Sequence, residues 1–246
     1  MKKLLSPKNL PLTVAVAAAC SGAVRLWFLS AGADKEGLLI PGHIANILGW
    51  VLTALVVLVV LISCRQLISA AKYAFNFPPS LLGAIGSAAA AMGILVTSLA
   101  GLIGNADFLS RLCGILGILS ALALLFLGFC RWKGLHCNVL MHGIVCVYLL
   151  VYLLCQYRIW SSQPQLLSYG YQLVGCICLL IAVYRRTCFD GNTGNRKAYA
   201  TFRLLAAYFC LVATVGSTAP LFYLTCGFWS LTDMCNLTPM PRPDKG

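Results

Sequence analysis

Residues 44–64 read IANILGWVLTALVVLVVLISC, a run of 21 residues without one charged side chain. A helix that crosses the hydrocarbon core of a bilayer needs about 20 mostly apolar residues, because every backbone N–H and C=O group must be satisfied inside the segment. The run therefore predicts a transmembrane helix.

Six other stretches are similarly long and apolar. The seven predicted spans are Leu12–Ser30, Ile44–Cys64, Leu81–Ile103, Leu112–Cys130, Asn138–Cys155, Leu166–Tyr184 and Leu204–Trp229. The composition agrees, since 60% of the residues are hydrophobic and only 10% are charged, outside the range of soluble domains. We expect an all-α integral membrane protein: one bundle of seven transmembrane helices over residues 1–230, and a short Pro-rich tail over 231–246 that is disordered.

Positive charge is concentrated in alternate connections. Twelve of the 18 Lys and Arg residues lie in the N-terminus and in the second, fourth and sixth connections, whereas five of the six acids lie on the other side. The positive-inside rule makes the basic side cytoplasmic. The N-terminus is then inside and the C-terminus outside, and the net charge of +12 needs no nucleic acid to explain it.

The N-terminus has a second interpretation. Lys2 and Lys3, the apolar run at 12–19 and Cys20-Ser21-Gly22 resemble a lipoprotein signal that is cleaved before Cys20. The apolar run continues past that point to Leu29, which favours an uncleaved first span.

Small residues and a proline shape three of the later spans. Gly86–Ala90 and Gly117–Ala121 have the spacing that lets helix backbones approach closely, so the third and fourth spans are expected to pack as a tight hairpin. Small residues are also simply common in such helices. Pro220 lies inside the seventh predicted span, where we expect it to kink the helix.

Arg25 is the only formal charge clearly inside a predicted span. It lies about 8 Å of helix from Ser30, at 1.5 Å per residue, which is within snorkelling reach of the outer interface. The alternative is a buried functional cation. Because no predicted span contains Asp or Glu, its partner would be a carbonyl, a polar side chain or an anionic ligand.

Polar and aromatic residues gather at the same predicted depth. One interpretation is an interfacial belt of Tyr and Trp. The other is a small outward-facing pocket for an anionic or polar ligand, which we state as a hypothesis for Arg25, Tyr152, Gln156, Arg158, Tyr169 and Gln172.

His142 has Asn138 and Cys146 four residues away on one helix face. Imidazole and thiolate can share a metal ion, but no further ligand is evident, so a histidine that packs within the bundle is favoured and no metal or cofactor is expected. Cys226 and Cys235 are close in sequence and are both expected outside, where a disulfide can form.

The sixth connection is strongly basic. Its Gly191–Lys197 segment lacks the frame of a phosphate-binding P-loop. We expect a loop that contacts the anionic lipid headgroups of the cytoplasmic leaflet. The residues in question are Arg185, Arg186, Arg196, Lys197 and Arg203.

One segment carries a resemblance. Tyr157-Arg158-Ile159-Trp160, Pro164, Tyr169, Gln172-Leu173, Tyr184 and Phe189-Asp190-Gly191 resemble a pattern in uncharacterised multi-span membrane proteins of anaerobic Gram-positive bacteria. That group has no assigned activity. The resemblance implies the cytoplasmic membrane of a bacterium and no particular chemistry.

The sequence favours a non-enzymatic function. We expect a small ligand-binding, sensor or accessory membrane protein with an outward-facing polar pocket. A transporter or channel component is the alternative, and an intramembrane enzyme comes third, since no second catalytic group accompanies His142 or any cysteine.

Overall fold

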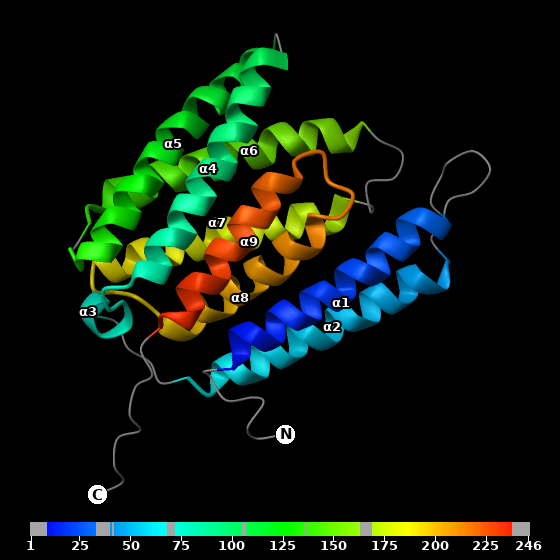
Figure 1. The fold of residues 1–246 in the computed structure, drawn as a ribbon, viewed down its shortest axis with the longest axis horizontal. Helices are drawn as coiled ribbons and strands as arrows, with labels where there is room; N and C mark the ends of the chain where they lie inside the picture. The colour runs from blue at the N-terminus through cyan, green and yellow to red at the C-terminus, as the bar shows by residue number, and fades with distance from the viewer. Residues whose placement is uncertain are drawn as a thin grey trace, which may run out of the picture.

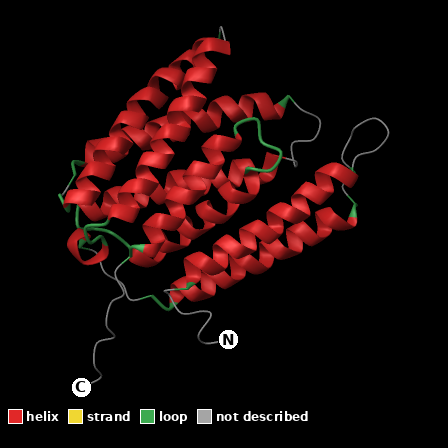
Figure 2. Cartoon of the chain, in the orientation of Figure 1, coloured by secondary structure: helices red, strands yellow, loops and turns green. Residues whose placement is uncertain are grey.

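The computed structural model describes residues 9–32, 40, 42–67, 72–104, 107–135, 137–162 and 169–237, and every regular element within them is a helix (Figure 2). The helices are α1 (Leu10–Ala31), α2 (Ile44–Arg65), α3 (Tyr73–Asn76), α4 (Leu81–Gly104), α5 (Phe108–Lys133), α6 (Val139–Ser161), α7 (Gly170–Asp190), α8 (Arg196–Ala213) and α9 (Pro220–Cys235).

Six of these helices, α1, α2, α4, α5, α6 and α7, are long and apolar enough to cross a membrane. Their lateral surfaces expose large apolar side chains, such as Leu12, Leu122 and Leu140. An apolar surface of this extent is stable against lipid and not against water. The expectation of a multi-pass, all-helical membrane protein is therefore confirmed.

The prediction of one continuous helix over Leu204–Trp229 is wrong. Helix α8 ends at Ala213, residues 214–219 form a turn, and α9 begins at Pro220. Gly216 adopts a φ of 76° in the turn, a conformation that favours glycine. Pro220 starts a helix instead of kinking one. The N–H groups in the first turn of a helix have no intrahelical acceptor, so a proline there breaks no hydrogen bond.

The turn reverses the chain. Helix α1 runs parallel to α8, since Ser21 Oγ accepts a hydrogen bond from the Tyr208 hydroxyl at 2.8 Å and Arg25 Nε donates to the Val215 carbonyl at 2.8 Å. Helix α9 runs back along α8, so that Asp233 meets Arg203.

The beginning of α1 and the end of α9 consequently lie at the same end of the bundle (Figure 1). The predicted placement of the two termini at opposite ends does not hold for the described chain. The first part of the predicted tail, residues 231–235, belongs to α9. Residues 238–246 lie outside the described residues.

We call the two ends of the bundle the Asp233 end and the Asp107 end. The Asp233 end contains the beginnings of α1, α4 and α8 and the ends of α5, α7 and α9. The Asp107 end contains the end of α4, the beginning of α5, the end of α6 and the α8–α9 turn (Figure 1). Helix α8 lies between the α1–α2 hairpin and the other long helices, and most of its side chains are buried.

Glycines bring α4 close to two neighbours. A Cβ atom at Gly117 of α5 would lie 1.8 Å from Ser98 Oγ of α4, so the predicted α4–α5 hairpin is confirmed. Gly86 of α4 faces α9 instead, where a Cβ would lie 1.9 Å from Thr232 Oγ1. This packing holds the end of α9 against α4 and α5, beside the polar residues described next.

Candidate functional site

Asp233, in the last turn of α9, is 1% exposed. Its Oδ2 atom accepts hydrogen bonds from Arg186 Nη1 at 2.7 Å, Arg203 Nη2 at 2.8 Å and the Tyr199 hydroxyl at 3.1 Å. The Arg203 guanidinium also lies over the Trp229 ring, with 3.8 Å from Cζ to the centroid. Three helices, α7, α8 and α9, therefore meet at one carboxylate, and two arginines share its single negative charge.

Arg131, in the last turn of α5, is 3% exposed and lies next to this group. Among the residues that the structure describes, none accepts a hydrogen bond from its Nε, Nη1 or Nη2 atoms. Its guanidinium instead lies over the Phe77 ring, with 4.9 Å from Arg131 Cζ to the ring centroid. The Arg186 guanidinium lies over the same ring, with its Cζ at 4.7 Å from the centroid. Gly83 makes room for it, since a Cβ there would lie 3.1 Å from Arg131 Nε.

His142 of α6 and Asp190 of α7 form a second buried contact, with 3.1 Å between Nδ1 and Oδ2. The contact supports the interpretation of His142 as a residue that packs within the bundle. Within the described ranges, no group of three or more His, Cys, Asp or Glu is arranged to hold a metal ion.

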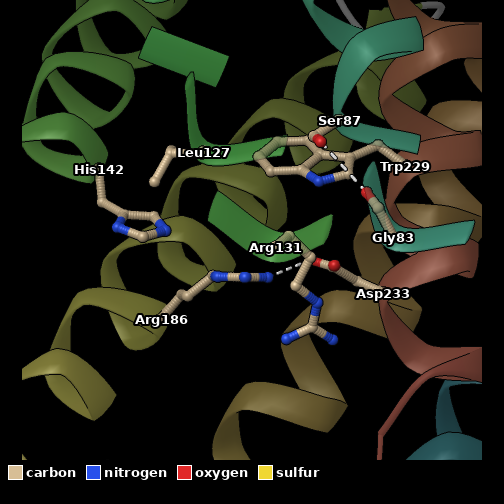
Figure 3. Close-up of a pocket in the computed structure, with 8 residues that line it drawn as sticks. All are labelled: Gly83, Ser87, Leu127, Arg131, His142, Arg186, Trp229 and Asp233. Atoms are coloured by element: carbon tan, nitrogen blue, oxygen red, sulfur yellow. Dashed lines mark hydrogen bonds and ion pairs between the residues drawn. The ribbon is translucent and has the colours of Figure 1, made fainter. Parts of the chain in front are cut away.

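A small pocket lies among these groups. Arg186 points toward Asp233, with Arg131 beside the pair and the Trp229 indole nearby (Figure 3). The pocket is lined by Gly83, Ser87, Leu127, Arg131, His142, Arg186, Trp229 and Asp233. We call it the arginine pocket.

The arginine pocket lies in a positively charged part of the interior. Among the described residues, four buried arginines gather at the Asp233 end, Arg131, Arg186, Arg196 and Arg203, together with the buried acids Asp190 and Asp233. Arg196 Nη1 donates a hydrogen bond to Asn76 Oδ1 at 3.3 Å. Asn76 directly precedes Phe77, the ring that Arg131 and Arg186 contact. The described interior at this end therefore contains more arginines than aspartates.

The predicted lipid-contact residues need correction. Arg186, Arg196 and Arg203 are 6%, 4% and 0% exposed, so they are interior residues and not part of a headgroup-facing loop. Arg185 is half-buried and Lys197 is exposed. Sequence reasoning placed Asp233 on the opposite side of the membrane, and it therefore missed the acid that brings Arg186 and Arg203 inward.

The residues of the predicted outer pocket lie in separate surroundings. Arg25 and Gln172 contact consecutive carbonyls of the α8–α9 turn: Arg25 Nε donates to Val215 at 2.8 Å and Gln172 Nε2 to Gly216 at 3.3 Å. The Arg25 guanidinium also lies 4.8 Å from the Tyr171 ring centroid. Both residues thereby hold the turn that the sequence did not predict.

Tyr152 and Gln156 line a different, larger pocket between α4, α5 and α6, at the Asp107 end. Arg158 forms an ion pair with Asp107 whose side chains are 62% and 53% exposed, respectively. Tyr169 stacks on Trp160, with 5.5 Å between the ring centroids.

The cysteines are thiols in the described chain. Cys226 is buried and Cys235 is exposed, and no disulfide joins them. Cys137, in the α5–α6 connection, is buried, and burial raises the pKa of its thiol to about 12.

Comparison with known proteins gave no match to a family model, to a curated protein or to a solved structure. The functional conclusion therefore depends on the site alone.

Proposed function

We propose that this protein is a multi-pass membrane protein that binds a small anion in the arginine pocket. The observation that carries the proposal is the Arg131 guanidinium, which is buried and lacks a hydrogen-bond acceptor among the described residues. An unpaired charge in the interior destabilises a fold, and a buried ion without its partner typically costs about 3–5 kcal/mol. Residues that are retained against such a cost are usually functional.

The chemistry of the pocket favours an anion. Guanidinium groups present a planar fork of N–H donors that matches the oxygens of carboxylates and phosphates. Arg186 shares Asp233 with Arg203, so Asp233 does not neutralise the pair. A bound anion would give Arg131 its missing acceptor and reduce the excess positive charge. This places the ligand site at the end of the bundle opposite to the one that the sequence suggested.

We further propose that the Asp233 end faces the cytoplasm of a bacterial cell and that all eight long helices cross the membrane. The basic residues Arg65, Arg131, Arg185 and Lys197 lie at this end, as the positive-inside rule requires. Helices α8 and α9 have 18 and 16 residues, or roughly 27 and 24 Å of helix. This nearly matches the roughly 30 Å hydrocarbon core, and their neighbours cover much of their surface.

The proposed function is tested by thermal unfolding of the purified protein in detergent. Acetate, sulfate and phosphate are added separately at constant ionic strength. We expect at least one of them to raise the melting temperature of the wild type and of Lys133→Gln, a control that removes an exposed charge from the same turn of α5. Arg131→Gln should not respond. Equal responses from Arg131→Gln and the wild type, or no response to any anion, would overturn the proposal.

One observation favours transport as a second candidate. Helices α4, α5 and α6 line the arginine pocket at one end and the larger pocket at the other end. Ile94, Leu124 and Val145, all 0% exposed, lie on these helices between the two pockets, as a closed gate would. Sulfate flux into proteoliposomes that is lost in Arg131→Gln would favour transport, whereas binding without flux would favour a receptor or accessory protein.

A further inference from the structure

We infer that the larger pocket at the Asp107 end, between α4, α5 and α6, binds a small uncharged molecule with several hydroxyl groups, a short polyol. This site is separate from the arginine pocket, so the inference goes beyond the proposed anion binding. Three features carry it: buried hydroxyls without hydrogen bonds, a polar lining without charge, and a cavity of limited size. Two residues of the predicted outer pocket, Tyr152 and Gln156, belong to the lining.

Two hydroxyls in the lining are buried without a hydrogen-bond partner. Ser98 of α4 is 5% exposed and Tyr148 of α6 is 1% exposed. The two side chains lie near each other, but neither hydroxyl makes a hydrogen bond to a described residue. A hydrogen bond between the two would still leave one hydroxyl hydrogen without an acceptor. Because a buried polar group without a partner destabilises a fold, these hydroxyls favour a ligand that both donates and accepts hydrogen bonds.

The rest of the lining is polar and uncharged. Its further polar groups are the hydroxyls of Thr97 and Ser110, the amide of Gln156 and the thiols of Cys113 and Cys155. None of the described lining residues is Lys, Arg, Asp or Glu. Asp107 and Arg158, at the same end, pair with each other and are more than half exposed. An ionic ligand would lose its hydration in this pocket without gaining a counter-charge, so the lining selects a neutral ligand.

Two aromatic rings complete the lining. The ring centroids of Tyr148 and Tyr152 lie 5.9 Å apart, and Tyr152 packs on Phe222 of α9 with 4.5 Å between the centroids. These rings give the pocket apolar surface for the carbon atoms of a ligand. A polyol has carbon-bound hydrogens for such a surface and hydroxyls for the polar groups beside it.

The size of the cavity limits the ligand to a few atoms. Its volume is about 80 Å³, whereas one water needs roughly 10–15 Å³ and a cavity of roughly 150 Å³ accepts benzene. The pocket is thus suited to a molecule of roughly three to six non-hydrogen atoms. Ser110 and Gln156 are half-buried, so the pocket opens to the surface of the protein. A Cβ atom at Gly101, which also lines the pocket, would meet no atom within 4 Å.

The test is protection of the pocket thiols from alkylation. Cys113 and Cys155 lie in contact with each other and are 9% and 8% exposed, so a reagent reaches them through the pocket. The full-length protein in nanodiscs is treated with iodoacetamide, a small uncharged reagent, and the reaction at each cysteine is followed by mass spectrometry. Cys235, which is exposed at the other end of the bundle, is the internal control.

Glycerol should slow the alkylation of Cys155 and leave that of Cys235 unchanged. 1-Propanol has the same carbon chain with a single hydroxyl, and it should need a concentration roughly ten-fold higher, because two hydrogen bonds are lost. Lactate is similar in size but charged, and it should not protect Cys155. Arg131→Gln should retain the protection by glycerol, since the arginine pocket is a separate site.

Variants of the lining identify the site. Tyr148→Phe and Ser98→Ala each remove one hydroxyl, and each should raise the half-protecting concentration of glycerol about 2- to 10-fold. Gly101→Leu should fill the pocket, slow the alkylation of Cys155 and remove the effect of glycerol. Gly143→Leu is the matched control on α6, because a Cβ there also meets no atom within 4 Å, and it should behave as the wild type.

Four results would overturn the inference. If glycerol does not protect Cys155, the pocket contains water only. If 1-propanol protects as well as glycerol, the hydroxyls are not recognised, and if lactate does so, the pocket does not select a neutral ligand. If neither pocket thiol of the wild type reacts, the pocket is closed to molecules of this size. Each of these results leaves the proposed anion binding at Arg131 intact.

Discussion

The two ends of the bundle use arginine and aspartate in opposite ways. At the Asp107 end, Asp107 and Arg158 form one ion pair whose side chains remain more than half exposed. At the Asp233 end, Asp233 is buried against two arginines, and a third arginine lies beside them without an acceptor among the described residues. Solvent screens the first pair, whereas the buried second group is screened much less. The contribution of an ion pair to stability therefore depends on its burial and on the groups around it.

The largest expected difference between the two ends comes from removing each aspartate charge. Asp233→Asn should lower the free energy of unfolding by about 3–5 kcal/mol, because it leaves Arg186 and Arg203 buried without their carboxylate. Asp107→Asn should lower it by about 1 kcal/mol or less, as for other exposed pairs. Reversible unfolding in mixed micelles measures both variants. Similar losses in the two variants would contradict the burial argument.

Glycine packing provides a second comparison along α4. Gly86→Ala would bring a methyl group within 1.9 Å of Thr232 Oγ1 and push α9 away, so we expect a loss of about 1–3 kcal/mol in unfolding free energy. Gly101→Ala, toward the Asp107 end of the same helix, meets no atom within 4 Å.

The Gly101→Ala variant should stabilise the helix by roughly 0.5–1 kcal/mol, since alanine restricts the unfolded chain more than glycine does. The same unfolding measurement applies to both variants. The account of α4–α9 packing fails if Gly86→Ala is tolerated as well as Gly101→Ala.

Thiol labelling gives the smallest effect and identifies the side that the Asp233 end faces. The pKa of about 12 keeps the buried Cys137 thiol protonated at pH 8, and the thiolate is the reactive form, so Cys137 should resist a maleimide reagent in the folded protein. Cys235 is exposed at the same end and should react.

A membrane-impermeant maleimide should label Cys235 in inside-out vesicles and not in intact cells, with Cys235→Ser as the control. Labelling of Cys235 in intact cells would show that the Asp233 end faces outward. Comparable labelling of Cys137 and Cys235 would show that the α5–α6 connection is open.

The long apolar runs were predictable because a membrane span is a local property of 20 or so residues. The break between α8 and α9 was not, because Pro220 inside an apolar run is compatible with a kink as well as with a new helix. Gly216, which takes the positive φ of the turn, is the signal that distinguishes the two. Once the break is missed, Asp233 is predicted at the end of the bundle opposite to Arg203, which it contacts in the structure.

The sequence did not predict the arginine pocket, for a related reason. Arg131 and Arg186 lie near helix ends, and Arg203 directly precedes the predicted span Leu204–Trp229. A basic residue at such a position is ordinarily exposed to headgroups. Their burial depends on Asp233, which is 30 residues beyond Arg203 and reaches it only because the chain reverses. Arg25 was correctly singled out as a residue in need of a partner, and one of its partners is the Val215 carbonyl.

The central claim is that Arg131 binds a ligand and does not stabilise the fold. The direct measurement is the free energy of unfolding of Arg131→Gln in a buffer free of phosphate and sulfate, beside the wild type and Lys133→Gln. The account predicts that Arg131→Gln is at least as stable as the wild type, because an uncompensated buried charge has been removed. A loss of several kcal/mol, similar to that of Asp233→Asn, would show that Arg131 supports the structure and would contradict the claim.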